Sequence, residues 1–205
     1  MRKRLSKHAS QQHLVEATLT TIYQYGFQNA TTARVAREAG LSAGNIHHQF
    51  GAKEELFSVA MRSLMSDISD AMVEQLADAA TPLQRVQAIL EANLSDQLFN
   101  RRICFVWLQF WAASLNEKSL ARLERINAQR FHGNLLSALK RLVGEEHAQP
   151  LAHSLMAMVD GFWRLKAQAE PGPSAAQARE CVFAFLDSRL SAIGVADGQK
   201  EGSPV

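Results

Sequence analysis

Hydrophobic residues recur every three to four positions along almost the whole of this chain, and no sustained strand-like alternation interrupts them. That period matches one face of an α-helix and does not match a strand, whose side chains alternate. Glycine and proline gather at a few places between the periodic segments, where they end helices or form turns. These breaks are Gly26, Gly40 to Gly51, Pro82, Gly144 to Pro150, Pro171 to Pro173 and the stretch after Gly194. The pattern predicts an all-α fold.

Composition excludes several classes of protein. The 205 residues are 47% hydrophobic and 20% charged, which allows a core without disulfide or metal staples. No apolar run is long enough to span a membrane, and none follows the basic N-terminus as in a signal peptide. Cys104 and Cys181 have no metal-binding spacing, and no H-E-x-x-H pattern is present. We therefore expect a cytoplasmic protein without a metal, a cofactor or a membrane partner.

Charge is distributed unevenly. The first 54 residues carry seven basic and three acidic side chains, although the net charge of the chain is only +2. A basic module on a mildly acidic body favours a polyanion such as nucleic acid as partner, the alternative being a chance asymmetry. The basic start, residues 1–9, contains Arg2, Lys3, Arg4 and Lys7. Such an arm can enter a minor groove, add phosphate contacts or simply stay solvated.

The breaks divide the chain into four parts. They are a basic arm at 1–9, a small helical module at 10–55 with a linking helix to about 76, a helical body at 77–194 and a disordered tail at 195–205. Thr31, Thr81 and Ser174 are predicted helix N-caps, with Pro82 as the first residue after Thr81 and a capping box after Ser174. Gly26 is predicted to end the first helix.

Two short helices are predicted on either side of Gly40. Val35, Ala36 and Ala39 give the first helix a buried side, Ile46 and Phe50 anchor the second, and Leu41 is expected to fill the corner between them. The second helix keeps small or hydrogen-bonding side chains on or near its outer face: Ala43, Gly44, Asn45, His47, His48 and Gln49. No acidic group is among them, which suits a helix lying in the major groove of DNA. An ordinary helical hairpin is the alternative.

Residues 10–60 resemble the tetracycline-repressor (TetR) family of bacterial regulators. The resemblance rests on Gly26-Phe27, Thr31-Thr32, Val35-Ala36, Ala39-Gly40-Leu41-Ser42, Gly44, His48, Phe50 and Lys53-Glu54-Glu55-Leu56-Phe57. It implies a three-helix, helix-turn-helix DNA-binding head on a helical body that binds a ligand and forms a homodimer. The sequence departs from the family pattern at His47, where an aromatic residue is usual, at Gln49 and at Ala52, where a capping side chain is common.

The resemblance also implies which residues contact double-stranded operator DNA. They are Thr31, Thr32, Ser42, Ala43, Gly44, Asn45, His47, His48 and Lys53. Thr32, His48 and Lys53 correspond to phosphate contacts. Ala43, Asn45 and His47 correspond to positions that face base edges.

The body contains all three tryptophans and one carboxylate in an apolar run. Candidate effector-binding residues are Trp107, Phe110, Trp111, Asp160 and Trp163. Aromatic faces with a carboxylate form a suitable site for a quaternary ammonium ion. A buried carboxylate needs a cation or hydrogen-bond donors. The alternative is therefore a large aromatic core in which Asp160 pairs with Arg164, Arg130 or a helix end.

A second similarity covers about residues 100–165. It rests on Phe110-Trp111-Ala112-Ala113-Ser114-Leu115, on Leu123 to Leu135 with Arg130, and on Val159-Asp160-Gly161-Phe162-Trp163. These residues resemble the BetI-type branch of the TetR family, which represses genes for glycine betaine synthesis. The similarity implies a small cationic effector, choline or betaine aldehyde; a regulator of drug efflux with a lipophilic or cationic drug is the alternative. A four-helix dimer interface is expected from the helices at 151–169 and 174–193. Its predicted apolar residues are Leu155, Met158, Phe162, Val182, Phe185, Leu186 and Leu190.

Residues 40–44 read G-x-S-x-G, the motif around the nucleophilic serine of many hydrolases. That motif positions a nucleophilic serine only on a strand-to-helix elbow. A helix is predicted before it, so Ser42 is better explained as a helix N-cap. We therefore expect no enzymatic activity.

Overall fold

The computed structural model describes residues 7–195, without the side chains of residues 7–10, 45 and 47–49. Its helices are α1 (Lys7–Asn29), α2 (Thr32–Glu38), α3 (Ala43–Phe50), α4 (Lys53–Ala77), α5 (Pro82–Asn93), α6 (Arg101–Ser114), α7 (Lys118–Gln168) and α8 (Ala175–Ile193). The described residues contain no strand, so the all-α prediction is confirmed. The predicted arm up to residue 6 and the tail from residue 196 lie outside the described residues.

The chain forms two compact units. The first runs to Ser66 and includes Phe105–Arg125, and the second consists of Asp67–Cys104 and the chain from Ile126 onward. Helices α4, α6 and α7 therefore each contribute to both units. No helix in the described part of the chain is both long and apolar enough to cross a membrane.

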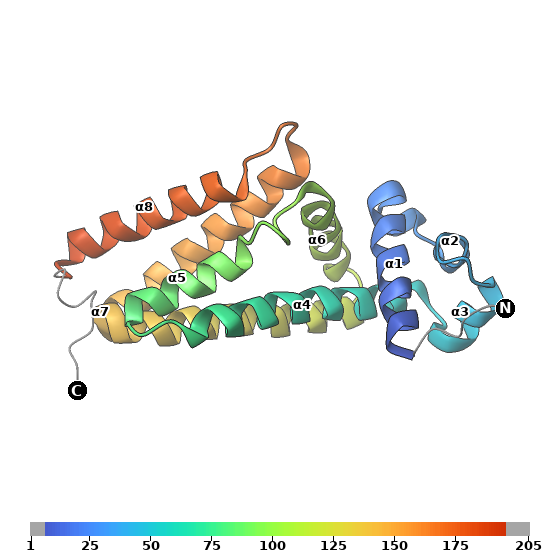
Figure 1. Cartoon of the computed structure of the whole chain (residues 1–205), viewed down its shortest axis with the longest axis horizontal. Helices are drawn as coiled ribbons and strands as arrows, with labels where there is room; N and C mark the ends of the chain where they lie inside the picture. Colours follow the sequence, from blue (N-terminus) through green and yellow to red (C-terminus); the bar gives the residue numbers. More distant parts are fainter. Residues whose placement is uncertain (1–6, 196–205) are drawn as a thin grey trace. The chain divides into compact units, whose positions relative to one another are not determined.

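The core of the first unit holds the two short helices against α1 and the start of α4 (Figure 1). Its buried residues are Leu14, Ala17, Val35, Ala36, Ala39, Ile46 and Leu56, with Phe50 packed against them. The inward positions predicted for α2 and α3 are thereby confirmed. The His13 ring adds a polar contact, because its Nε2 donates to the carbonyl of Ala39 at 3.0 Å.

The prediction that Leu41 fills the corner between α2 and α3 is wrong. The residue surface of Leu41 is 44% exposed. The Leu41 amide instead bonds to the carbonyl of Ala36 at 2.8 Å, and Gly40 takes a positive φ of 61°. The turn is thus formed by backbone geometry, and the hydrophobic side chain faces solvent.

Glycines 26 and 144 interrupt α1 and α7. Gly26 has φ 70° and ψ 163°, and Gly144 has φ 76° and ψ 174°. Essentially only glycine occupies this backbone region. The predicted break at Gly26 is confirmed, although Gly26 is not in the left-handed conformation of a helix C-cap and a helical turn follows it. The second part of α7 starts before residue 151, because Pro150 lies inside the helix.

Most of the apolar residues predicted for a dimer interface belong to the core of the second unit. Leu155, Val182, Leu186 and Leu190 are fully buried within the protomer, so the prediction is wrong for these four. The reason is that α8 packs lengthwise along the second part of α7 (Figure 1) and needs a complete apolar stripe for that contact. Met158, Phe162 and Phe185 are half-buried and remain available to a partner.

The three predicted N-caps are present. The Thr31 side chain accepts from the amide of Arg34, while Thr81 with Gln84 and Ser174 with Gln177 form complete capping boxes. In the Ser174 box the two hydrogen bonds measure 3.1 and 2.8 Å. They satisfy the backbone amides of Ser174 and Gln177 at the start of α8, which has no acidic residue in its first turn.

We expect Ser174→Ala to lower the free energy of unfolding by about 1 kcal/mol, since an N-cap serine contributes roughly 0.5–2 kcal/mol. Thermal unfolding at a fixed protein concentration measures this loss. Ser188→Ala, on the exposed face of the same helix, is the control and should change stability far less. Equal effects of the two substitutions would contradict the capping role.

Candidate functional site

Helix α3 presents the predicted DNA-facing surface. Ile46 is buried and Phe50 packs on the core, while Leu41, Ser42, Ala43 and Gly44 are exposed. The Ser42 carbonyl accepts from the Ile46 amide at 3.4 Å, which places Ser42 directly before the first helical residue. The side chains of Asn45, His47 and His48 lie outside the described residues, so their base and phosphate contacts remain predictions.

Thr31 and Thr32 lie at the start of α2. Thr31 is exposed, and its hydroxyl oxygen is 3.3 Å from the Arg34 amide, which donates to it. Thr32 is the first residue of the helix and is half-buried. Arg34 is held nearby, because its guanidinium lies 4.3 Å from the ring centroid of Tyr25 and donates to the carbonyl of Asn29 at 2.8 Å. The Arg34 guanidinium is therefore held in place at the start of α2.

Lys53 has an internal role that the sequence did not predict. Its Nζ donates to the carbonyls of Phe27 and Gln28, at 3.3 and 3.0 Å, and lies 4.5 Å from the Phe27 ring centroid. These contacts tie the start of α4 to the segment between α1 and α2. An ammonium has three donors, so two carbonyl bonds leave one for a phosphate oxygen.

Trp107, Phe110 and Trp111 gather on one side of α6. The Trp107 ring meets Phe110 and Trp111 edge to face, with centroid distances of 5.9 and 6.4 Å. Trp107 and Phe110 are buried, whereas Trp111 is half-buried and so keeps surface for a ligand. The structure therefore brings these three predicted residues together in the first unit.

Asp160 and Trp163 lie in the second unit. Trp163 is buried; its indole Nε1 donates to the carbonyl of Asn93 at 2.9 Å, and its ring meets that of Phe99 at 6.3 Å. Hydrogen bonding of the indole to a backbone carbonyl fixes this side chain as part of the core. The five predicted effector residues are thus divided between the two units.

Loss of hydration raises the pKa of Asp160 to about 6. Asp160 is nevertheless exposed to solvent, so the neighbouring protein atoms remove only part of the hydration of its carboxyl group. Among the described residues no neighbouring charge opposes the shift. Arg164, one of the predicted partners, donates instead to Gln168 at 2.9 Å. Asp160 is therefore a carboxylate whose ionised form lacks a compensating cation in the described part of the chain.

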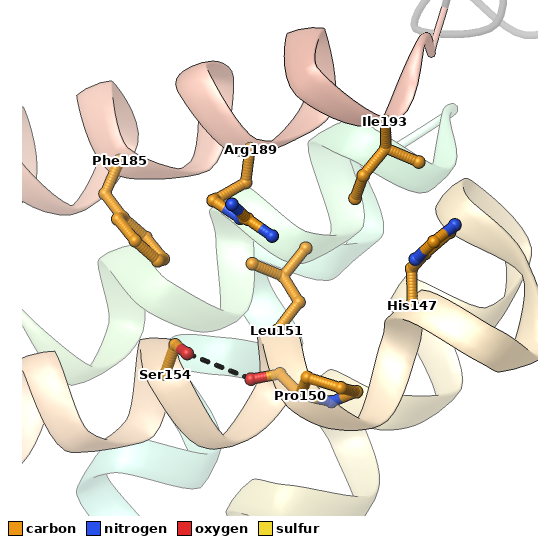
Figure 2. A pocket seen from close by; sticks show the side chains of 7 residues that line it. All are labelled: His147, Pro150, Leu151, Ser154, Phe185, Arg189 and Ile193. Carbon is orange, nitrogen blue, oxygen red and sulfur yellow. Dashed lines mark hydrogen bonds between the residues drawn. The ribbon is translucent and has the colours of Figure 1, made fainter.

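A pocket of about 340 Å³ lies between α7 and α8 of the second unit (Figure 2). Its lining residues are His147, Pro150, Leu151 and Ser154 from α7 and Phe185, Arg189 and Ile193 from α8. None of them was predicted as an effector-binding residue, although Phe185 was predicted for the dimer interface. The lining includes an arginine and a histidine but no carboxylate, so it does not suit a quaternary ammonium ion.

Two segments of the chain match known protein families. Residues 14–60 match the family described as bacterial regulatory proteins of the tetR family. Residues 82–191 match the BetI-type transcriptional repressor C-terminal family. The HTH-type transcriptional regulator BetI of Stenotrophomonas maltophilia is 36% identical over 182 residues, covering 88% of this chain and 93% of that protein. The chain belongs to the BetI-type repressors of the TetR family.

Solved structures agree with this assignment. A transcriptional regulator from Pseudomonas aeruginosa PAO1 has a TM-score of 0.81 at 25% identity, covering 92% of this chain and 93% of that one. A regulator from Saccharomonospora viridis, crystallised in complex with choline, has a TM-score of 0.75 at 22% identity, with coverages of 88% and 97%. The similarity to the Saccharomonospora viridis regulator shows that the two proteins have the same fold.

Family membership makes the chain a helix-turn-helix transcriptional regulator, and regulators of this family bind operator DNA and small-molecule effectors and form dimers. The G-x-S-x-G residues lie in the turn from α2 into α3. They are therefore not on the strand-to-helix elbow that such a nucleophile needs.

We expect Lys53→Met to have two separable effects. Loss of two charge-assisted hydrogen bonds should lower the free energy of unfolding by about 1–2 kcal/mol. Loss of a phosphate contact should weaken binding to all DNA sequences alike and reduce the salt dependence of log K by about one ion. Operator titrations at several salt concentrations measure the second effect. If the salt dependence stayed the same, Lys53 would act only through its hydrogen bonds to the carbonyls of Phe27 and Gln28.

His47→Ala should behave differently, because the position of His47 corresponds to one that faces base edges. We expect it to relax the sequence preference at one base position of each half-site and to leave the salt dependence nearly unchanged. Binding to a set of single-base operator variants measures that preference. If the preference stayed the same at every position, His47 would not read the DNA sequence.

Proposed function

We propose that this protein is a dimeric repressor of glycine betaine synthesis genes that releases its operator when choline or betaine aldehyde binds. The match of residues 82–191 to the BetI-type C-terminal domain carries the proposal. The choline complex of the Saccharomonospora viridis regulator, which has the same fold, supports a quaternary ammonium as effector. The sequence of α3, which has small or hydrogen-bonding residues and no acidic one at its predicted outer positions, supports the DNA-binding half.

The chemistry of the effector residues is consistent with a quaternary ammonium ion. Choline carries a positive charge without N–H donors, so a protein can hold that charge only through aromatic faces and carboxylates. Each unit offers one candidate contact: Trp111 of the first unit has a half-buried ring beside Trp107, and Asp160 of the second unit has a carboxylate without a neighbouring cation in the described part of the chain. A cation bound near Asp160 would compensate its lost hydration and favour the ionised form.

The pKa of Asp160 leads to a pH dependence with a definite sign. The pKa of this carboxyl group is about 6 in the folded protein, above its ordinary value. The group is therefore mostly protonated at pH 5 and mostly ionised at pH 7. We therefore expect choline affinity to rise roughly tenfold between pH 5 and pH 7. Isothermal titration calorimetry at the two pH values measures this change.

Asp160→Asn should abolish that pH dependence, and the neutral carbon isostere of choline, 3,3-dimethylbutanol, should bind the native protein equally at both pH values. Trp111→Ala should weaken choline about two- to thirtyfold at pH 7, the range of a cation–π contact of 0.5–2 kcal/mol. A lipophilic cationic dye that binds and releases operator where millimolar choline does neither would instead indicate a drug-responsive regulator.

The same pKa affects stability in the opposite direction. Because the folded pKa exceeds the unfolded one, the contribution of Asp160 to stability is complete below about pH 4 and is lost as the pH rises through 6. Asp160→Asn should therefore gain stability relative to the native protein over this interval.

A dimer on a two-fold symmetric operator is part of the proposal. Symmetric protein requires half-sites about one helical turn apart, or roughly 34–36 Å. The half-buried Met158, Phe162 and Phe185 are candidates for the interface. Light scattering at micromolar concentration should give twice the chain mass, and a monomer that binds its operator tightly would overturn this part of the proposal.

A further inference from the structure

Gln109 of α6 is bonded to the end of α1, far away in sequence. The Phe27 amide donates to its side-chain Oε1 at 3.0 Å, across 82 positions of the chain. Gly26 lies directly against the same oxygen, because a Cβ at that position would be 3.3 Å from Oε1. Both residues belong to the first unit, so this is a contact within one compact body.

Lys53 holds the same residue, Phe27, at its carbonyl. The Phe27 carbonyl accepts from Lys53 Nζ at 3.3 Å, while its amide is bound by Gln109. The segment that leads into α2 and α3 is therefore fixed by one side chain of α4 and one of α6. Neither bond belongs to a helix ladder, so either can break without unfolding a helix.

An unbroken series of ring contacts joins this segment to the predicted effector aromatics. Phe27 packs on Phe57 at 4.9 Å, and Phe57 meets Phe110 edge to face at 6.1 Å. Phe110 then contacts Trp107, and Trp107 contacts Trp111. Gln109 lies on α6 within this same turn of aromatic residues. Displacement of α6 at its tryptophans therefore has two routes to Phe27, through packed rings and through the Gln109 amide.

We propose that Gln109 is a positioning residue that couples effector binding to operator affinity. With its Oε1 on the Phe27 amide, the segment before α2 is held in the operator-binding arrangement. A ligand that contacts Trp111 moves α6 and breaks that bond, which releases α2 and α3 from this arrangement. The coupling to an effector rests on the proposed function, whereas the positioning of α2 and α3 by Gln109 does not.

The test compares Gln109→Leu, which removes the acceptor, with Gln109→Glu, which retains an acceptor oxygen. Without effector, the leucine variant should bind operator roughly two- to tenfold more weakly, as expected for one lost hydrogen bond, and the glutamate variant should stay near the native value. Gln24→Leu, an exposed position on α1 of the same unit, is the matched control and should not change operator affinity.

The coupling itself is measured by operator affinity with and without saturating choline and by choline affinity without DNA. The leucine variant should bind choline at least as tightly as the native protein, yet show a smaller choline-induced loss of operator affinity. If the ratio of operator affinities without and with choline were the same in the leucine variant as in the native protein, Gln109 would have a structural role only. Operator affinities equal to native in both Gln109 variants would overturn the positioning role as well.

Amide hydrogen exchange at Phe27 in the native protein gives a second readout that needs no variant. The amide should be protected without effector and exchange faster with saturating choline; protection unchanged by bound choline would contradict the coupling. If choline left native operator affinity unchanged, the proposed effector would be wrong. The leucine and glutamate variants would still decide whether Gln109 positions α2 and α3.

Discussion

The burial of Ile46 and its neighbours is the contact on which the DNA-binding half depends. Helices of 7 and 8 residues are too short to be stable alone in water, since nucleation costs more than a few hydrogen bonds return. Tertiary packing must therefore supply their stability, and the α1 and α4 residues Leu14, Ala17 and Leu56 provide it. The described outer residues at the start of α3, Ala43 and Gly44, are exposed and small, so they leave the helix free to approach a partner closely.

This arrangement also explains why the segment between α1 and α2 matters. The short helices are held by one shared core, so their orientation depends on where the chain enters α2. Gly26 sets that entry with a backbone conformation that essentially only glycine adopts, and Phe27 is then fixed through its ring, its amide and its carbonyl. A single residue, Phe27, thus connects the packing of α4 and α6 to the direction of α2.

Features governed by local chemistry were predictable from the sequence. The caps at Thr31, Thr81 and Ser174 and the interruptions at Gly26 and Gly144 follow from the properties of one residue and its near neighbours. The inward residues of α2 and α3 follow from helical period. Family resemblance added the DNA-binding assignment, which the periodic pattern alone left open against an ordinary hairpin.

Features that depend on which segments meet were not predictable. The Gln109 bond to Phe27 and the Lys53 bonds to Phe27 and Gln28 leave no periodic signal, because polar side chains can reach any exposed carbonyl or amide. Leu155 and Leu186 were mistaken for dimer residues because an apolar stripe on one helix does not reveal whether its partner is in the same chain. Leu41 failed for a related reason, since backbone bonds formed the turn that its side chain was expected to fill.

Under the proposed function, the predicted effector residue Asp160 would let a regulator select a cation without a preformed ion pair. A carboxylate paired with arginine would resist a quaternary ammonium, which would have to displace that partner. Asp160 has no such partner among the described residues, and its lost hydration makes the ionised form unfavourable until a cation approaches. Under the proposed function, choline binding therefore relieves an unfavourable state already present in the free protein. A neutral molecule of the same shape gains none of that relief, so Asp160 would discriminate between the two by charge.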